Sequence, residues 1–555
     1  MPSSTTNINL EIFDHPTIGR IQGVKSSPNV VEYLGIQYAT LSNAFARGSI
    51  GHYAGSGSTI VAITHGPTVI NPANICEREQ ELIQARLHCT QSKQSATESL
   101  TLNISVPTNV PADSGLPVLV FVHGGGFASG SANHPQYNLT RIVEISAKDG
   151  IPIIAVGLNY RVGIAGFLIS KEMKELGYKA NNGLDDQRLG LRWIKHHIRG
   201  FGGDPERITF LGQSAGSVAG NIHLQSNEPL FEQYISMSGT AFSRPRRPEV
   251  GQKAYDSLVK GLGVAEASPY EQARKLLSEV ENMGDQARRY NLGPTVDGDI
   301  VPEALVFRNQ VEPESALKTF PGLRHCRRIL VGDCQFDGTA FESRLPSQTD
   351  TLPQALIASL KESLDSTDAR FVPAILSRYG LGQSASPNST ETTRRAILDL
   401  GNDIHFALPA LALAKIWSKT TVPSAKAFLY HFNCPNPWDG PWKGEANHIL
   451  DIAFALQNYN EQLSVGQRQC AGRFGKDFIR FVNGEDVWGE YRAGERPTSM
   501  IYSAQIDGEK DDSHLVHDES SASTGRRTFI QELGAEHIHD KVLHSWQVFM
   551  SATRK

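Results

Sequence analysis

The spacing of hydrophobic and polar residues changes along the chain in the way expected for alternating strands and helices. Residues 100–106 alternate between apolar and polar, which predicts a half-buried strand. Residues 117–122 and 151–156 are nearly continuous apolar runs, typical of strands buried on both faces. Between 185 and 197 the apolar positions fall on roughly one side of a helix. The pattern therefore predicts an α/β fold, with a mostly parallel sheet covered by helices on both faces.

The same pattern bears on domain organisation. Short strands are predicted at 19–24 and 31–38, ahead of the central run of strands. Two polar and mainly helical stretches, at about 240–320 and 345–415, are interpreted as insertions that cover the site. No Pro/Ser/Gly-rich linker is long enough to divide two cores, so we expect residues 1–555 to form a single domain.

The strongest chemical signal is the pentapeptide Gly212-Gln213-Ser214-Ala215-Gly216. It follows the apolar run 208–211 and precedes a small-residue segment that continues as a helix. A strand, a tight turn and a helix are the context in which G-x-S-x-G forms a nucleophile elbow, because the turn leaves no room for a flanking Cβ. We therefore predict that Ser214 is a nucleophile. A glycine-rich turn with an idle serine is the alternative.

A serine nucleophile needs a base and an acid, which follow it in this type of fold in the order Ser, Asp or Glu, His. Asp337 lies in a turn after the apolar strand 328–332 and is the predicted acid. Asp333 is a nearby rival, and a simple Asp-Gly turn is the other alternative. His448, in a glycine-containing loop before an apolar segment, is the predicted base. The chain has 18 histidines, and only its place in this order singles His448 out.

A glycine cluster supplies the fourth component of the predicted site. His123-Gly124-Gly125-Gly126-Phe127 follows the strand 117–122 directly. Three glycines let bare backbone amides turn inward, as in the HGGG type of oxyanion loop. We predict that the amides of Gly125, Gly126 and Ala215 bind the oxyanion of a tetrahedral intermediate.

Composition narrows the possible functions. The chain is 39% hydrophobic and 20% charged with a formal net charge of −5, so it lacks the basic footprint of a nucleic-acid-binding protein. Its six cysteines form no C-x-x-C pair and no disulfide framework, and we expect neither a metal nor another cofactor. The polar N-terminus and the lack of an apolar stretch near ~20 residues predict no signal peptide, no membrane anchor and a cytoplasmic location.

Longer motifs carry a resemblance to a known family. They are Asn159-Tyr160-Arg161-Val162-Gly163, Asn182-Gly183-Leu184-Asp185-Asp186-Gln187-Arg188, Phe201-Gly202-Gly203-Asp204-Pro205 and Gly293-Pro294-Thr295-Val296-Asp297-Gly298. From about residue 19 to about 500 the chain resembles the type-B carboxylesterase/lipase family, the α/β-hydrolase branch that includes the cholinesterases. The resemblance implies an α/β-hydrolase fold and ester cleavage through an acyl-enzyme. It puts Ser214, Asp337 and His448 on the catalytic positions, and Gly125, Gly126 and Ala215 on the oxyanion positions.

Departures from the family pattern bear on substrate and compartment. Gln213 stands where the family commonly has Glu, and no tryptophan precedes Trp193, so a cationic substrate would lack its charge partner and its π-face. Asp337 stands where the family more often has Glu, and can orient the histidine in the same way. Ser99 replaces the cysteine of the secreted members' first disulfide, which fits a reducing compartment.

The function expected from the sequence is hydrolysis of a small neutral metabolite ester. A lactonase, thioesterase or acyltransferase with the same triad is the alternative, a long-chain lipase ranks lower, and a non-catalytic cholinesterase-like binding protein is a rival from another class. The sequence leaves open the oligomeric state and whether any cysteines pair. The predicted pocket walls are Phe127, Gln213, Met237, Trp438 and Trp442.

Overall fold

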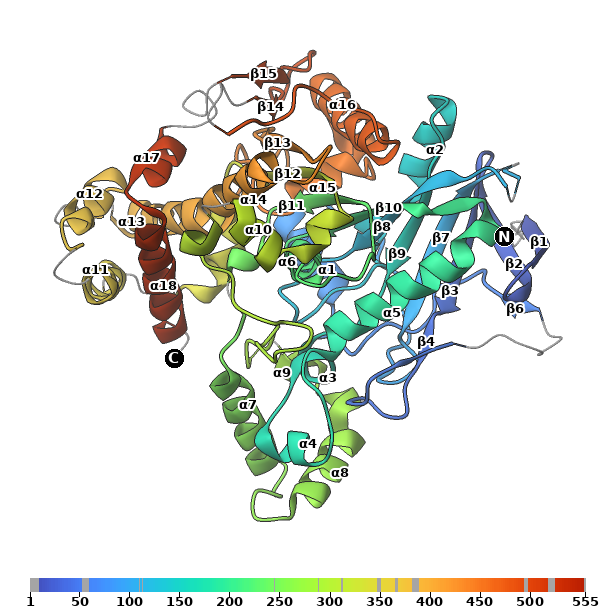
Figure 1. Ribbon diagram of the computed structural model, residues 1–555, viewed down its shortest axis with the longest axis horizontal. Helices are drawn as coiled ribbons and strands as arrows, with labels where there is room; N and C mark the ends of the chain where they lie inside the picture. The colour runs from blue at the N-terminus through green and yellow to red at the C-terminus, as the bar shows by residue number, and fades with distance from the viewer. Residues whose placement is uncertain are drawn as a thin grey trace, which may run out of the picture.

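A computed structural model provides the structure of the protein. It describes residues 9–51, 59–108, 110–111, 113–243, 245–287, 289–310, 313–346, 351–364, 368–381, 389–493, 498–517 and 525–553. The described residues form a 13-stranded sheet at the centre of the molecule, with helices around it (Figure 1). A two-stranded sheet, β4 (Ala39–Thr40) with β5 (Ser49–Ile50), lies apart from it.

The middle of the large sheet is parallel, as predicted. Neighbouring strands pair in parallel in the order β9-β8-β10-β11-β12-β13-β14. Their bounds are Ile154–Leu158 (β9), Leu116–Val122 (β8), Gly203–Gln213 (β10), Gln233–Met237 (β11), Arg328–Cys334 (β12), Lys426–Phe432 (β13) and Ser499–Tyr502 (β14).

The flanks of the sheet are mainly antiparallel. On one side β7 pairs with β9 and leads outward through β3 and β2 to β1, and on the other side β15 pairs with β14. The short strand β6 (Ile60–Val61) adds to β2 in parallel. The flanking strands are β1 (Leu10–His15), β2 (Gly19–Ser27), β3 (Val30–Gln37), β7 (Thr101–Pro107) and β15 (His514–Val516).

The apolar runs form strands because both faces of the sheet are covered. Val118, Val120 and Val122 of β8 belong to one core cluster, and Leu119 and Phe121 to another on the opposite face. Helices α5 (Asn182–His197) and α6 (Ala215–His223) contribute to the first cluster, and α2 (Thr140–Lys148), α15 (Leu450–Ala455) and α16 (Val465–Val482) to the second. The prediction of a sheet covered on both faces is confirmed.

The stretches interpreted as insertions are helical. The first contains α7 (Pro248–Gly261), α8 (Pro269–Glu279), α9 (Gly284–Ala287) and α10 (Pro313–Thr319). The second contains α11 (Leu352–Ser363), α12 (Phe371–Arg378), α13 (Ser389–Asn402), the π-helical turn η8 (Asp403–Ala407) and most of α14 (Leu408–Lys419). The C-terminal helices α17 (Arg526–Glu532) and α18 (Glu536–Ala552) lie on the same side of the molecule as α11 to α13 (Figure 1).

The expectation that no stretch is apolar enough to span a membrane needs correction. Residues Glu391–Lys419, which run through α13, η8 and α14, form the one described helix that meets the length and hydropathy criteria, with a mean hydropathy of 1.2. The fold buries 83% of the apolar segment of this helix, so these side chains pack as those of a core helix do.

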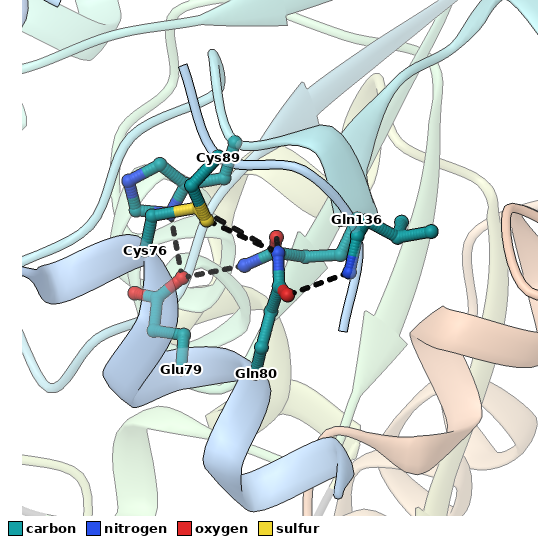
Figure 2. Close-up of a disulfide and its surroundings, with 7 residues drawn as sticks. Cys76, Glu79, Gln80, Cys89 and Gln136 are labelled. Carbon is teal, nitrogen blue, oxygen red and sulfur yellow. Dashed lines mark hydrogen bonds and ion pairs between the residues drawn. A yellow bond between two sulfur atoms is a disulfide. The ribbon is translucent and has the colours of Figure 1, made fainter. Parts of the chain in front are cut away.

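The sequence left open whether any cysteines pair, and in the structure Cys76 and Cys89 form a disulfide. Gln80, on helix α1 (Ile75–Ile83), donates to both sulfur atoms and to Gln136 Oε1, at 3.6, 3.3 and 3.1 Å (Figure 2). A crosslink is therefore present in this region even though Ser99 replaces the family's cysteine. Cys89, which is nearer to Cys76 in the sequence than Ser99 is, supplies the second sulfur. The cytoplasmic location stays a prediction, and this crosslink counts against the reducing compartment invoked for it.

Candidate active site

The Ser214 turn has the geometry of a nucleophile elbow. β10 ends at Gln213 and α6 begins at Ala215, with Ser214 between them at φ 53° and ψ −117°. This is a strained conformation for a residue with a side chain, and such strain clusters at functional sites. A Cβ at position 216 would lie 2.0 Å from the carbonyl oxygen of Val122, so only glycine allows α6 to begin this close to β8.

The structure brings Ser214, His448 and Asp337 together. His448 Nε2 lies 3.0 Å from Ser214 Oγ, and His448 Nδ1 lies 2.7 Å from Asp337 Oδ1. A carboxylate can only accept, so Nδ1 carries the proton and Nε2 faces the serine hydroxyl as an acceptor. Asp337 is fully buried and His448 is 6% exposed, so bulk water hardly competes for these contacts. The three side chains form a hydrogen-bonded chain.

Backbone contacts position Asp337, the predicted acid, and His448, the predicted base, relative to each other. Asp337 Oδ2 accepts from the amide of Cys334 at 2.8 Å, which fixes the carboxylate at the end of β12. The amide of His448 donates to Thr339 Oγ1 at 3.0 Å, and the amide of Phe336 donates to the carbonyl of Ala446 at 2.9 Å. The loop that carries the base is thereby attached to the turn that carries the acid.

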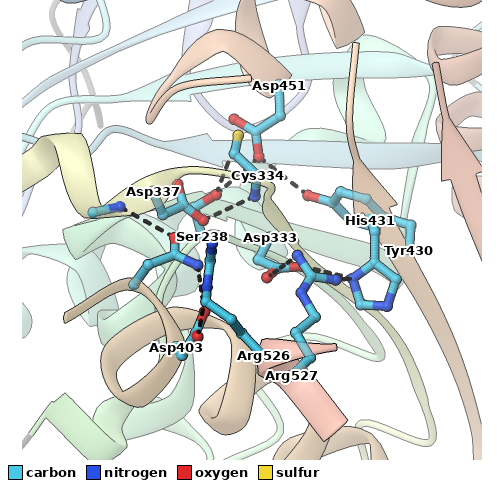
Figure 3. A network of polar contacts seen from close by, with 12 residues as sticks. Ser238, Asp333, Cys334, Asp337, Asp403, Tyr430, His431, Asp451, Arg526 and Arg527 are labelled. Atoms are coloured by element: carbon cyan, nitrogen blue, oxygen red, sulfur yellow. Dashed lines mark hydrogen bonds and ion pairs between the residues drawn. The ribbon is translucent and has the colours of Figure 1, made fainter. Parts of the chain in front are cut away.

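The rival acid, Asp333, occupies a different network. It lies on β12, four residues before Asp337, and is fully buried, with His431 Nδ1 at 2.7 Å and Arg527 Nη2 at 2.6 Å from its two oxygens. Figure 3 shows this cluster beside Asp337. The geometry therefore favours Asp337 as the partner of His448.

The predicted oxyanion loop follows β8 directly. Gly125 and Gly126 adopt φ values of 96° and 64°, and a Cβ on Gly125 would lie 2.0 Å from the carbonyl oxygen of Ser129. Within the described residues, the amides of Gly125 and Gly126 donate no hydrogen bond. The amide of Ala215 begins α6 and has no acceptor within its own helix. These three amides are available to a ligand, and the last adds the positive end of a helix dipole.

His123 supports the loop from beneath. Its ring stacks on Tyr160 at 4.5 Å, and its Nδ1–H donates to the carbonyl of Gly124 at 2.9 Å. Burial lowers the pKa of His123 to about 4, so the ring stays neutral at neutral pH. Gly124 in turn lies against the nucleophile, because a Cβ there would be 3.0 Å from Ser214 Cβ.

A second buried acid, Asp451, lies near Asp337 and His448 and was missed from the sequence. Its Oδ2 accepts from Ser238 Oγ at 3.1 Å and from Tyr430 OH at 3.2 Å (Figure 3). Burial, together with the nearby charge of Asp337, raises the pKa of Asp451 to about 6. Its position three residues after His448, within an apolar run, was a signal that could have found it.

A cavity of about 140 Å³ opens beside Ser214. Both helical insertions contribute to its walls, through Ala241, Arg246 and Pro294 and through the π-helical turn η8. The residues that line it are Gly126, Phe127, Ser214, Ala215, Val218, Ile222, Ser238, Gly239, Ala241, Pro245, Arg246, Pro294, Ala340, Phe341, Arg344, His405 and Phe406.

Of the five predicted pocket walls, Phe127 lines this cavity and the other four do not. Gln213 points under the glycine loop, since a Cβ on Gly124 would lie 2.6 Å from Gln213 Oε1. Met237 is fully buried in the core cluster on the other face of the sheet. Trp438 and Trp442 pack with Tyr459 and Phe336, at ring distances of 5.4 and 5.9 Å. These four side chains face away from this cavity because neighbours distant in sequence decide which way each side chain points.

The wall residues that the sequence did not reveal come largely from segments distant from the triad. Phe406 packs 5.3 Å from the His448 ring and lies in a π-helical turn, a feature frequent at functional sites. Arg246 and Arg344 bring positive charge to the cavity. In the described residues, no group of three or more His, Cys, Asp or Glu side chains is arranged to hold a metal ion.

Comparison with known proteins identifies the family. The family model described as "Carboxylesterase family" matches residues 9–491. The chain belongs to the carboxylesterase family.

This carboxylesterase-family chain is also similar to individual curated proteins and solved structures. It is 38% identical to "Lipase 5" of Diutina rugosa over 183 residues, and the aligned part covers 31% of this chain and 33% of that protein. It is 29% identical over 388 residues to "Cholinesterase" of Mus musculus, which covers 65% and 59%. The chain thus spans between a third and three fifths of the length of these two relatives. Its fold matches that of a solved "PNB esterase" with a TM-score of 0.70 and 21% identity, over 95% of this chain and 99% of that one.

Proposed function

We propose that this protein hydrolyses carboxylic esters through an acyl-enzyme formed on Ser214. The observation that carries the proposal is the hydrogen-bonded chain in which His448 lies 3.0 Å from Ser214 Oγ and 2.7 Å from Asp337 Oδ1. Family membership supports the same reaction class and a small-molecule ester as the substrate.

In the proposed acylation step, Ser214 Oγ attacks the ester carbonyl carbon while His448 Nε2 takes its proton. The carbonyl oxygen becomes an anion, which the amides of Gly125, Gly126 and Ala215 bind; the loss of one such donor typically costs about 3 kcal/mol of barrier. The imidazolium then protonates the alcohol oxygen as the C–O bond breaks, which leaves an acyl-serine.

Deacylation repeats these steps with water as the nucleophile. His448 takes a proton from water, the second tetrahedral anion collapses, and Ser214 leaves with its proton restored as the carboxylic acid is released. Asp337 holds the proton of His448 on Nδ1 in both halves and stabilises the imidazolium. Each step uses groups of this chain and water.

The test is pre-steady-state kinetics on short-chain p-nitrophenyl esters, with the wild type, Ser214→Ala and Ser278→Ala compared. Ser278 is an exposed serine on α8, so its variant controls for the substitution itself. We expect a stoichiometric p-nitrophenol burst in the wild type and the control, and none in Ser214→Ala. A burst that persists in Ser214→Ala would refute the assignment, and a folded wild type with no turnover of any ester would favour a binding protein.

A further inference from the structure

A second pocket, at the opposite end of the parallel strands from the triad, is lined by four arginines. They are Arg207, Arg324, Arg327 and Arg328, which lie at or near the starts of β10 and β12. Ser214 follows the far end of β10, so the strand, at about 3.3 Å per residue, separates this arginine pocket from the predicted nucleophile. The arginine pocket is therefore distinct from the cavity beside Ser214.

Two carboxylates line the same pocket, and a lysine lies beside both. Glu232 accepts from Lys195 Nζ at 2.8 Å and from the amide of Ile208 at 2.9 Å. Glu206 lies 3.8 Å from the same ammonium group. Lys195, which belongs to α5, thus compensates part of the negative charge at the wall of the pocket.

Arg328 and Arg207 already have partners, but only one of these partners is charged. Arg328 Nη1 forms an ion pair with Asp486 at 2.7 Å. Arg207 donates to two carbonyl oxygens, those of Gly115 and Asn483, at 3.2 and 3.4 Å. These neutral acceptors orient the Arg207 guanidinium and leave its charge uncompensated.

Arg324 and Arg327 are the other two arginines, and both side chains are exposed. Neither side chain forms a hydrogen bond or an ion pair in the part of the chain that the structure describes. The backbone of Arg327 is nevertheless fixed, because its amide donates to the carbonyl of Glu232 at 3.2 Å and its carbonyl accepts from the amide of Lys426 at 2.8 Å. The pocket thus presents available guanidinium groups on a backbone that is already in place, which lowers the ordering cost of binding.

These three uncompensated guanidinium groups suit a ligand with more than one negative charge. A phosphate monoester carries a charge of about −1.5 to −2 and three acceptor oxygens at neutral pH, whereas a carboxylate has one charge and two oxygens. Guanidinium groups bind phosphate through two parallel hydrogen bonds. The volume of about 440 Å³ lies within the range of roughly 300–1,000 Å³ that is typical of small-molecule sites, so it can also hold the organic group that carries the phosphate.

We propose that the arginine pocket binds a phosphate monoester, with Arg207, Arg324 and Arg327 around the phosphate group. The chain as a whole has a formal net charge of −5, so the attraction of this pocket for an anion is local. The proposal goes beyond the esterase function and does not depend on it.

The experiment is isothermal titration calorimetry of the full chain with glycerol 3-phosphate and, for comparison, with glycerate, at neutral pH and constant ionic strength. The wild type, Arg324→Gln, Arg327→Gln and the double variant are compared, with folding checked by circular dichroism. Arg20→Gln, at an exposed position on β2, is the matched control. Sedimentation with phosphatidylcholine vesicles, with and without phosphatidic acid, presents the same phosphate group on a lipid.

We expect the wild type to bind glycerol 3-phosphate at least about 10-fold more tightly than glycerate, and each single Gln variant to weaken this binding by about 10-fold, the lower value for a charge-assisted hydrogen bond. The double variant should lose the preference for phosphate, and Arg20→Gln should keep it. If a Gln variant does not fold, the wild-type affinity should still fall as salt rises, because salt screens charge attraction. Sedimentation only with phosphatidic acid, lost in the double variant, would assign the phosphate to a lipid headgroup, and calorimetric binding alone would assign it to a soluble molecule.

The inference would be overturned if the wild type bound neither glycerol 3-phosphate nor phosphatidic acid vesicles, or bound glycerate equally well. Unchanged affinity in a folded double variant would overturn it too. Each of these results would leave ester hydrolysis intact. A missing p-nitrophenol burst would remove the proposed esterase function and leave this site standing.

Discussion

Replacing Asp337 with Asn tests the proposed role of Asp337 most directly, because the structure dictates how the amide must be oriented. In the wild type, one carboxylate oxygen accepts from His448 Nδ1–H at 2.7 Å and the other from the Cys334 amide at 2.8 Å. An Asn side chain has only one oxygen. The Cys334 amide can only donate, so it takes that oxygen, and the NH₂ group then faces His448.

The consequence is the wrong tautomer of the base. Because His448 Nδ1 then faces an N–H donor, it must accept a hydrogen bond, and the imidazole proton moves to Nε2. Nε2 lies 3.0 Å from Ser214 Oγ and, once protonated, can no longer take the proton of the serine hydroxyl. The same change in another serine hydrolase lowers kcat about 10⁴-fold, which corresponds to about 5.5 kcal/mol of barrier. We expect a loss of this order in Asp337→Asn.

The assay is single-turnover acylation by a p-nitrophenyl ester, followed by stopped flow, with folding checked by circular dichroism. Asp333→Asn is the control, because Asp333 binds His431 and Arg527 and does not contact His448. The folded Asp333→Asn protein should acylate at a rate within about tenfold of the wild-type rate. That tenfold limit is much smaller than the rate loss expected when the base cannot act. A folded Asp337→Asn that acylates within tenfold of the wild type would refute the tautomer argument.

Three further predictions concern the oxyanion loop, the second acid and the disulfide. Gly125→Ala should lower kcat by at least about 100-fold, because its Cβ would meet a backbone oxygen at 2.0 Å. A Cβ on Gly126 would meet no atom of the described neighbouring residues nearer than 3.8 Å, so Gly126→Ala should cost about 1–2 kcal/mol of stability and a smaller loss of kcat, measured by thermal melts and steady-state rates. Burial raises the pKa of Asp451 from 3.8 to about 6, so the folded state binds this proton more tightly than the unfolded state does. The wild type should therefore gain about 2 kcal/mol relative to Asp451→Asn between pH 7 and pH 4, and equal urea-unfolding free-energy differences at the two pH values would contradict this. Cys76→Ser and Cys89→Ser should each lower the free energy of unfolding by about 3 kcal/mol, as should a reductant added to the wild type, because the disulfide closes a loop with a sequence separation of 13.

The disulfide loop also reaches the base. The carbonyls of Leu82 and Ile83, at the end of α1, accept from Asn447 Nδ2 at 2.7 Å and Asn436 Nδ2 at 3.0 Å. Asn447 directly precedes His448. The disulfide variants would therefore be expected to lose some activity along with stability, which the same burst assay can measure.

Features that depend on local geometry could be predicted from the amino-acid sequence. Apolar runs such as 117–122 predicted buried strands because each residue in such a run must leave water whichever face of the sheet it meets. The elbow at Ser214 and the loop at Gly125 could be located because each turn is so tight that only glycine fits beside it. The order Ser, Asp, His expected along the chain then identified Asp337 and His448 as candidates, although they lie 111 residues apart.

Features that depend on neighbours distant in sequence could be established from the folded chain alone. The choice between Asp337 and Asp333 required knowing which carboxylate meets His448 and which meets Arg527, 194 residues further along the chain. The cavity walls, with Arg246 and Arg344, come from segments whose local patterns are those of ordinary surface turns. A local pattern specifies backbone shape and burial, but the direction of a side chain and the charge it meets are set by packing between segments, and that packing exists only in the folded chain.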